Sequence, residues 1–164
     1  SHKRGWDDRW EEFSQWAEQG VELEQELLHL VNEDTEAFNK IMAAFGMPKA
    51  TDDDKARRAE AIENATLFAA QIPLQTMKAA MKVLPLCRAM AETGNPNSVS
   101  DAGVGALAAR SAVIGAALNV KINAASLQDK ATAQSLIDEA EALVKQAKAE
   151  EEAIIAIVEK TITK

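Results

Sequence analysis

Helix-breaking residues are scarce in this chain, and their scarcity is what most limits the folds it can adopt. The 164 residues include only seven Gly and four Pro, and they contain long runs of Ala, Leu, Glu and Lys. These residue types favour helices, and we find no strand-like alternation of apolar and polar positions. We therefore predict one all-α domain over residues 1–164, built as a bundle of long helices.

The first half of the chain is expected to contain two long helices. The first is predicted from about Trp6 to Gly46, with a bend at Gly20. Thr51 is followed three residues later by Asp54, which is the pattern of a capping box and predicts the start of the second helix. We expect this helix to run to about residue 93.

Prolines and a turn organise the rest of the chain. Pro73 and Pro85 lie inside the second helix, and each removes a backbone donor, so kinks or breaks are expected there. Residues 94–97, Gly-Asn-Pro-Asn, predict a turn. A third helix should follow over about residues 98–126, and a fourth should begin near Asp129.

Charge and composition narrow the classes of function. The formal net charge is −8, which disfavours nucleic acid and anionic membranes as main partners. Cys87 is the lone cysteine, so no internal disulfide can form, and no Cys/His spacing resembles a zinc site. We find no apolar run near the roughly 18 residues of a membrane span and no secretory signal. We expect a cytoplasmic protein without a metal.

Asp34 lies in the middle of an apolar helical stripe. Eight apolar residues fall within roughly 60° of its direction on a helical wheel: Leu23, Leu27, Leu30, Val31, Ala37, Phe38, Ile41 and Phe45. The carboxylate is therefore expected to point towards the core. A buried carboxylate is costly unless its pKa shifts or it finds a partner, which suggests a proton-transfer site. The alternative is a core Asp satisfied by a neighbouring helix or by a subunit contact.

The third helix carries a face of small and polar residues. On a helical wheel, six positions fall within about 40° of the Asn119 direction. They are Asp101, Gly105, Ala108, Ala112, Gly115 and Asn123. Four larger residues on another side are expected to form core: Leu107, Ile114, Leu118 and Ile122. The small face is either a seam for close helix packing or the floor of a ligand site, where Asp101, Asn119 and Asn123 read a polar edge.

Several short segments together resemble a known family. They are Leu30–Phe38, Met47–Lys49, Ile72–Leu74, Gly94–Asn95, Ser100–Asp101 and Gly115–Asn123. Their order and spacing resemble the cyclodeaminase/cyclohydrolase family over about residues 25–128. Its members include the C-terminal domain of formiminotransferase-cyclodeaminase and stand-alone methenyltetrahydrofolate cyclohydrolases.

The resemblance implies an all-helical homodimer that binds a tetrahydrofolate substrate in a cleft by the subunit interface, without a cofactor. It implies catalysis by Asp34. It also implies substrate binding by a set on the first and third helices: Asp101, Asn119, Asn123, Phe38 and Gly115. The leading hypothesis is 5-formimidoyltetrahydrofolate cyclodeaminase, and the alternative is methenyltetrahydrofolate cyclohydrolase. A non-catalytic helical assembly protein is the hypothesis from a different class.

The chain departs from the family at its start. Family members begin with a Gly-rich segment, and nothing like it precedes Ser1. We therefore expect an N-terminally incomplete domain, which keeps its bundle and Asp34 in place but binds folate weakly and turns over little until upstream residues are restored.

Overall fold

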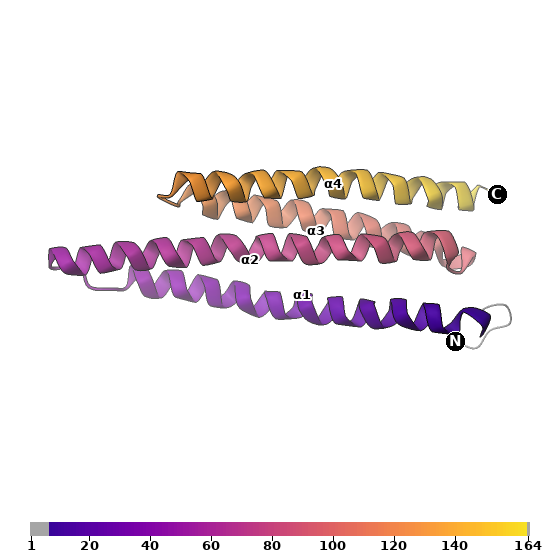
Figure 1. The fold of residues 1–164 in the computed structure, drawn as a ribbon, viewed down its shortest axis with the longest axis horizontal. Coiled ribbons are helices and arrows are strands. Elements are labelled where there is room, and N and C mark those ends of the chain that lie inside the picture. The colour runs from indigo at the N-terminus through magenta and orange to yellow at the C-terminus, as the bar shows by residue number, and fades with distance from the viewer. Residues whose placement is uncertain (1–6, 164) are drawn as a thin grey trace.

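The computed structural model describes residues 7–163, and they form a bundle of four long helices (Figure 1). The helices are α1 (Trp10–Phe45), α2 (Asp52–Thr93), α3 (Val99–Ala125) and α4 (Lys130–Ile162). Two short 3₁₀ helices, η1 (Asp7–Arg9) and η2 (Pro96–Ser98), precede α1 and α3. The predicted all-α bundle is confirmed, and no strand occurs over the described range. The expected helix start near Trp6 lies outside the described residues.

The helix ends follow the local signals in the sequence. At the start of α2, Thr51 Oγ1 accepts from the Asp54 backbone N–H, and the Thr51 N–H donates to Asp54 Oδ2, both at 3.1 Å. Asp129 caps α4 by accepting from two backbone N–H groups of its first turn. Glu63 of α2 adds a tertiary contact, since its carboxylate accepts from the backbone N–H of Gln128 at 2.9 Å. The capping box predicted at Thr51 is confirmed.

The helix α2 is the centre of the bundle. It packs against the other three helices, whereas α1 packs mainly against α2, and α4 packs against α2 and α3. The main core therefore lies among α2, α3 and α4. Its largest fully buried side chains include Met77, Leu84, Val113, Val120 and Ile154. The first helix is left with a large share of its surface uncovered.

The two prolines do not break α2. The helix continues from Asp52 to Thr93 through both Pro73 and Pro85, so the expected breaks are absent. Pro73 is buried and Pro85 is exposed. Packing on several sides holds the helix together where a backbone hydrogen bond is missing.

The core face of α3 differs from the prediction. The four larger residues expected inside are 47%, 37%, 59% and 67% exposed, in the order Leu107, Ile114, Leu118 and Ile122. The buried face is instead made mostly of small residues, which are Ala102, Ala106, Ala109, Val113, Ala116, Ala117, Val120 and Ala124. Small side chains let α2 and α4 approach α3 closely, and this close packing decides which face turns inward.

The segment Pro96–Ala125 has the length and composition of a membrane-crossing helix. Its mean hydropathy reaches 1.4 over an 18-residue window, of which 39% is buried in the bundle. The expectation that no apolar run approaches this length is therefore wrong for this helix. Core helices of bundles have the same composition, because they are apolar on most sides.

Candidate functional site

Asp34 does not point into the core of this chain. The residues that α1 turns towards α2 are spaced by seven: Leu23, Leu30, Ala37 and Ala44 are buried. Asp34 lies beside this row and is exposed. The prediction of a core carboxylate is therefore wrong for the single chain. The apolar stripe is wider than one neighbouring helix covers, so α2 buries only part of it.

The uncovered part of the stripe surrounds Asp34 with apolar surface. Val31 lies one turn before Asp34 and is 63% exposed, and Phe38 lies one turn after it and is 62% exposed. Phe45 continues the same face and is 52% exposed. We call these four residues the Asp34 face. An exposed apolar surface around a carboxylate is typical of a site that a ligand or another chain covers.

The small face of α3 is open at Gly115. A Cβ atom built on Gly115 would meet nothing within 4 Å, and Asn119, one turn further on, is exposed. Other glycines of α3 are packed, since a Cβ on Gly103 would lie 3.4 Å from Ile155 Cδ1. The packing seam proposed for the small face is therefore not formed at Gly115 within the chain. The floor remains free for a ligand or a partner.

Four contacts set how α1 and α3 align along α2. They are Glu26–Lys82 and Phe45–Arg58 for α1, and Gly105–Cys87 and Asn123–Ala69 for α3. Interpolating between these contacts places Asp34 and Asn119 at about the same level of the bundle, beside Pro73 of α2. The two residues, 85 positions apart in the sequence, therefore lie at one level of the bundle, on two helices that each pack mainly against α2.

Asn123 is already bonded within the protein. Its side-chain amide Nδ2 donates to the backbone carbonyl oxygen of Ala69 at 2.8 Å, and the residue is half-buried. This donor is therefore not available for the ligand contact that the sequence predicts for Asn123. Phe38 and Gly115, predicted beside it, are exposed and have room for a substrate.

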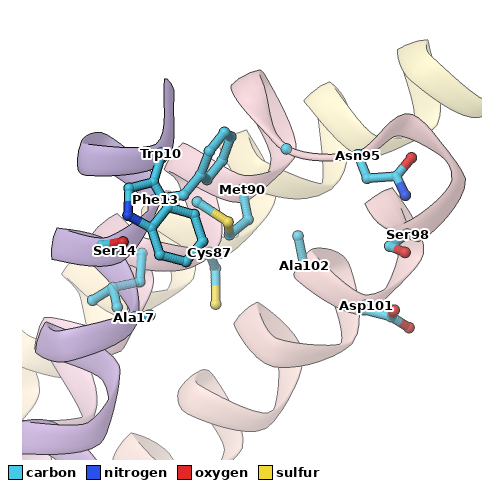
Figure 2. A pocket seen from close by; sticks show the side chains of 12 residues that line it. Trp10, Phe13, Ser14, Ala17, Cys87, Met90, Asn95, Ser98, Asp101 and Ala102 are labelled. Carbon is cyan, nitrogen blue, oxygen red and sulfur yellow. The ribbon is translucent and has the colours of Figure 1, made fainter. Parts of the chain in front are cut away.

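Asp101 lies away from the other predicted site residues. It is 18 residues before Asn119 on α3, which is roughly 27 Å along a helix. It lines a cavity of about 710 Å³ between the ends of α1, α2 and α3, where Trp10 and Phe13 lie across from Asn95, Ser98 and Asp101 (Figure 2). The structure therefore does not bring Asp101 next to Asn119, and Asp101 belongs to this separate cavity.

The cavity itself was not predicted from the sequence. The sequence gives no signal for it at Trp10 and Phe13, because aromatic residues at helical spacing are more often part of a core or an interface than of a ligand site. Burial raises the pKa of the Cys87 thiol, whose side chain also lines the cavity. A raised pKa keeps this thiol protonated and a poor nucleophile near neutral pH.

Known proteins resemble this chain in both sequence and fold. The family model for formiminotransferase-cyclodeaminase matches residues 1–142. The chain belongs to this family. Methenyltetrahydrofolate cyclohydrolase of Methylorubrum extorquens is 38% identical over 151 residues, which cover 92% of this chain and 73% of that enzyme. The match confirms the family resemblance, and the matched range holds Asp34, Asp101 and Asn119.

Two further relatives define the limits of the similarity. Formimidoyltransferase-cyclodeaminase of Sus scrofa is 33% identical over 74% of this chain, which spans only 23% of that longer protein. The crystal structure of formiminotetrahydrofolate cyclodeaminase from Thermotoga maritima aligns with a TM-score of 0.75 at 24% identity. The alignment covers 98% of this chain and 74% of the Thermotoga maritima chain, so the two proteins have the same helical-bundle fold.

Proposed function

We propose that this family member is an enzyme of folate one-carbon chemistry that acts on the carbon bridging N5 and N10 of tetrahydrofolate. The family match across α1, α2 and α3 carries this proposal, because these helices hold Asp34, Asn119 and the open floor at Gly115. The reaction moves water, ammonia and protons without net oxidation or reduction, so it requires no redox cofactor. Among residues 7–163, no group of three or more His, Cys, Asp or Glu could hold a metal ion.

The first candidate reaction is methenyltetrahydrofolate cyclohydrolase. The 38% identity to the Methylorubrum enzyme, with most of both chains covered, favours this reaction. Water adds to the cationic methenyl carbon and loses a proton, which leaves a hydroxyl on that carbon. As the bond from the carbon to N5 breaks, the hydroxyl loses its proton to form the formyl carbonyl and N5 takes up a proton, so that 10-formyltetrahydrofolate forms with net release of one proton. We assign both proton transfers to the Asp34 carboxylate, which accepts a proton from the water and returns one to N5. General acid–base catalysis of this kind typically raises the rate 10²- to 10⁴-fold.

The second candidate is formimidoyltetrahydrofolate cyclodeaminase, which the Sus scrofa relative favours. Here N10 attacks the formimidoyl carbon on N5, ammonia leaves with a proton, and the methenyl bridge closes. Asp34 would accept the N10 proton and supply one to the leaving amine. Both candidates use the same carbon and the same carboxylate, which is why one site could support either.

We also propose that two copies of the chain associate and cover the Asp34 face. The single chain leaves Val31, Phe38 and Phe45 of α1 exposed, and Leu118 and Ile122 of α3 as well. Large apolar surfaces of this kind are rare on monomers. Covering the surface would exclude water from around the carboxylate and its substrate, which strengthens electrostatic interactions there.

Offering both substrates to the naturally expressed protein tests the proposal. Absorbance of the methenyl form should fall if the protein is a cyclohydrolase, and it should rise from the formimidoyl substrate if the protein is a cyclodeaminase. If absorbance changes with neither substrate, and folinic acid leaves the Trp fluorescence unchanged, the enzyme assignment is wrong. That pair of results would support a non-catalytic helical assembly protein.

A further inference from the structure

Pro73 leaves one carbonyl of α2 without its helical donor. In a regular helix the N–H of residue 73 would donate to the Ala69 oxygen, but proline has no N–H. The Asn123 side chain on α3 donates to this same oxygen at 2.8 Å. Ala69 and Pro73 are both buried, so water is a poor substitute for the missing donor.

We propose that Asn123 is a positioning residue, whose amide replaces the N–H removed by Pro73 and fixes α3 in register against α2. The Ala69 oxygen is an acceptor that the helix itself does not use at this point. A side-chain donor on a neighbouring helix therefore gains most by binding there. Sliding α3 along α2 by one residue would break the bond and leave the oxygen unpaired.

The register fixed by this bond is that of the proposed site. Asn119 lies one turn before Asn123 on α3, and Asp34 lies at about the same level on α1. Pro73, Ala69 and Asn123 thus fix the end of α3 that lies about two turns beyond Gly115. The effect on turnover rests on the proposed function, whereas the effect on helix register does not.

A double-mutant cycle between Asn123 and Pro73 tests the assignment. Asn123→Ala should lower Tm by roughly 3–8 °C, because a buried carbonyl loses its partner. Pro73→Ala restores the backbone N–H, so Asn123→Ala should lower Tm by less than half as much in that background. An equal loss in both backgrounds, or no loss from Asn123→Ala alone, would overturn the proposal.

Pro85 provides the matched control, because it is the other proline within α2. Its ring frees the carbonyl of Met81 rather than that of Ala69. Asn123→Ala should therefore lower Tm by as much in a Pro85→Ala protein as in the wild type. A loss that shrinks equally in the Pro73→Ala and Pro85→Ala proteins would show a general effect of proline removal and would contradict the specific replacement.

Two further measurements separate positioning from substrate contact. Asn123→Asp keeps the shape but cannot donate while ionised, so its Tm deficit should shrink as pH falls and the carboxyl becomes protonated. Pro73→Ala returns a helical donor to the Ala69 oxygen and so weakens its bond to Asn123; Asn123→Ala should therefore lower kcat less in the Pro73→Ala background than in the wild type, with KM nearly unchanged. An equal loss of kcat in both backgrounds, or a raised KM, would show that Asn123 contacts the substrate instead. If the wild type has no folate activity, the proposed function fails while the Tm cycle still tests the register.

Discussion

Gly115 and Gly103 lie on one helix, yet side chains at the two positions would meet different surroundings. Gly115 faces open space, whereas Gly103 faces Ile155 and Val158 of α4. The sequence predicts both as small positions and cannot show which of them is packed. The distinction depends on where α4 lies, because α4 packs along α3 at Gly103 but does not cover Gly115.

Leucine substitutions at these glycines should have opposite effects. Gly103→Leu should destabilise the protein by about 1–3 kcal/mol, because it overpacks the contact with α4. Gly115→Leu should leave Tm unchanged or slightly raised, since leucine favours helix and nothing obstructs it. It should still weaken folate binding, measured by isothermal titration. Unchanged folate affinity would contradict the floor, and a Tm loss equal to that of Gly103→Leu would contradict its openness.

Asn123 shows which part of a candidate site residue's role the sequence does not predict. Its place on the helical wheel correctly predicts that it lies near Asn119, but not what it binds. Its acceptor is the carbonyl oxygen of Ala69, 54 residues earlier, which lacks its donor within α2 because Pro73 has no N–H. A helical wheel describes one helix, so a bond between two helices lies beyond it.

At the scale of elements, the two adjacent glutamates of α4 occupy different environments. Glu151 is 5% exposed and pairs with Arg110 of α3, with 2.5 Å between Oε2 and Nη1. Glu150 pairs with Arg88 of α2 at 2.7 Å, but both side chains are more than one-third exposed. Water screens both members of the second pair, whereas in the first pair it reaches the Arg110 side chain, which is 31% exposed, but hardly reaches the Glu151 carboxylate.

We therefore expect the two alanine substitutions to differ strongly in chemical denaturation. Glu151→Ala should lower the free energy of unfolding by about 2–4 kcal/mol, since it leaves the Arg110 charge partly buried and unpaired. Glu150→Ala should cost less than about 1 kcal/mol. Equal losses would show that the burial of Glu151 has no energetic consequence.

Helix ends were predictable from the sequence, whereas helix faces were only partly so. The capping box at Thr51 and the cap at Asp129 depend on neighbouring residues alone, and both form as expected. Which face of α1 and α3 turns inward depends on how many helices surround each one. With α1 packed mainly on α2, three of the eight apolar residues of its stripe stay exposed, and they surround Asp34.

For the whole molecule, the exposed apolar faces of α1 and α3 predict self-association. Sedimentation at micromolar concentration should give twice the chain mass of 17.7 kDa. Phe38→Glu and Leu118→Glu should each shift the protein towards the monomer, because they place a charge in the proposed interface. Ala142→Glu on the exposed side of α4 is the control and should leave the dimer intact. A wild type of single-chain mass would contradict the proposed association.

Asp34 is proposed to transfer protons at the carbon between N5 and N10 of the folate. We would measure this with the Asp34→Asn substitution in the naturally expressed protein. The change keeps the size of an exposed side chain, so Tm should stay within about 2 °C, while turnover, followed by methenyl absorbance, should fall at least ~100-fold. Asp138→Asn, an exposed aspartate on α4, should retain full activity. Turnover of Asp34→Asn within tenfold of the wild type would contradict the account.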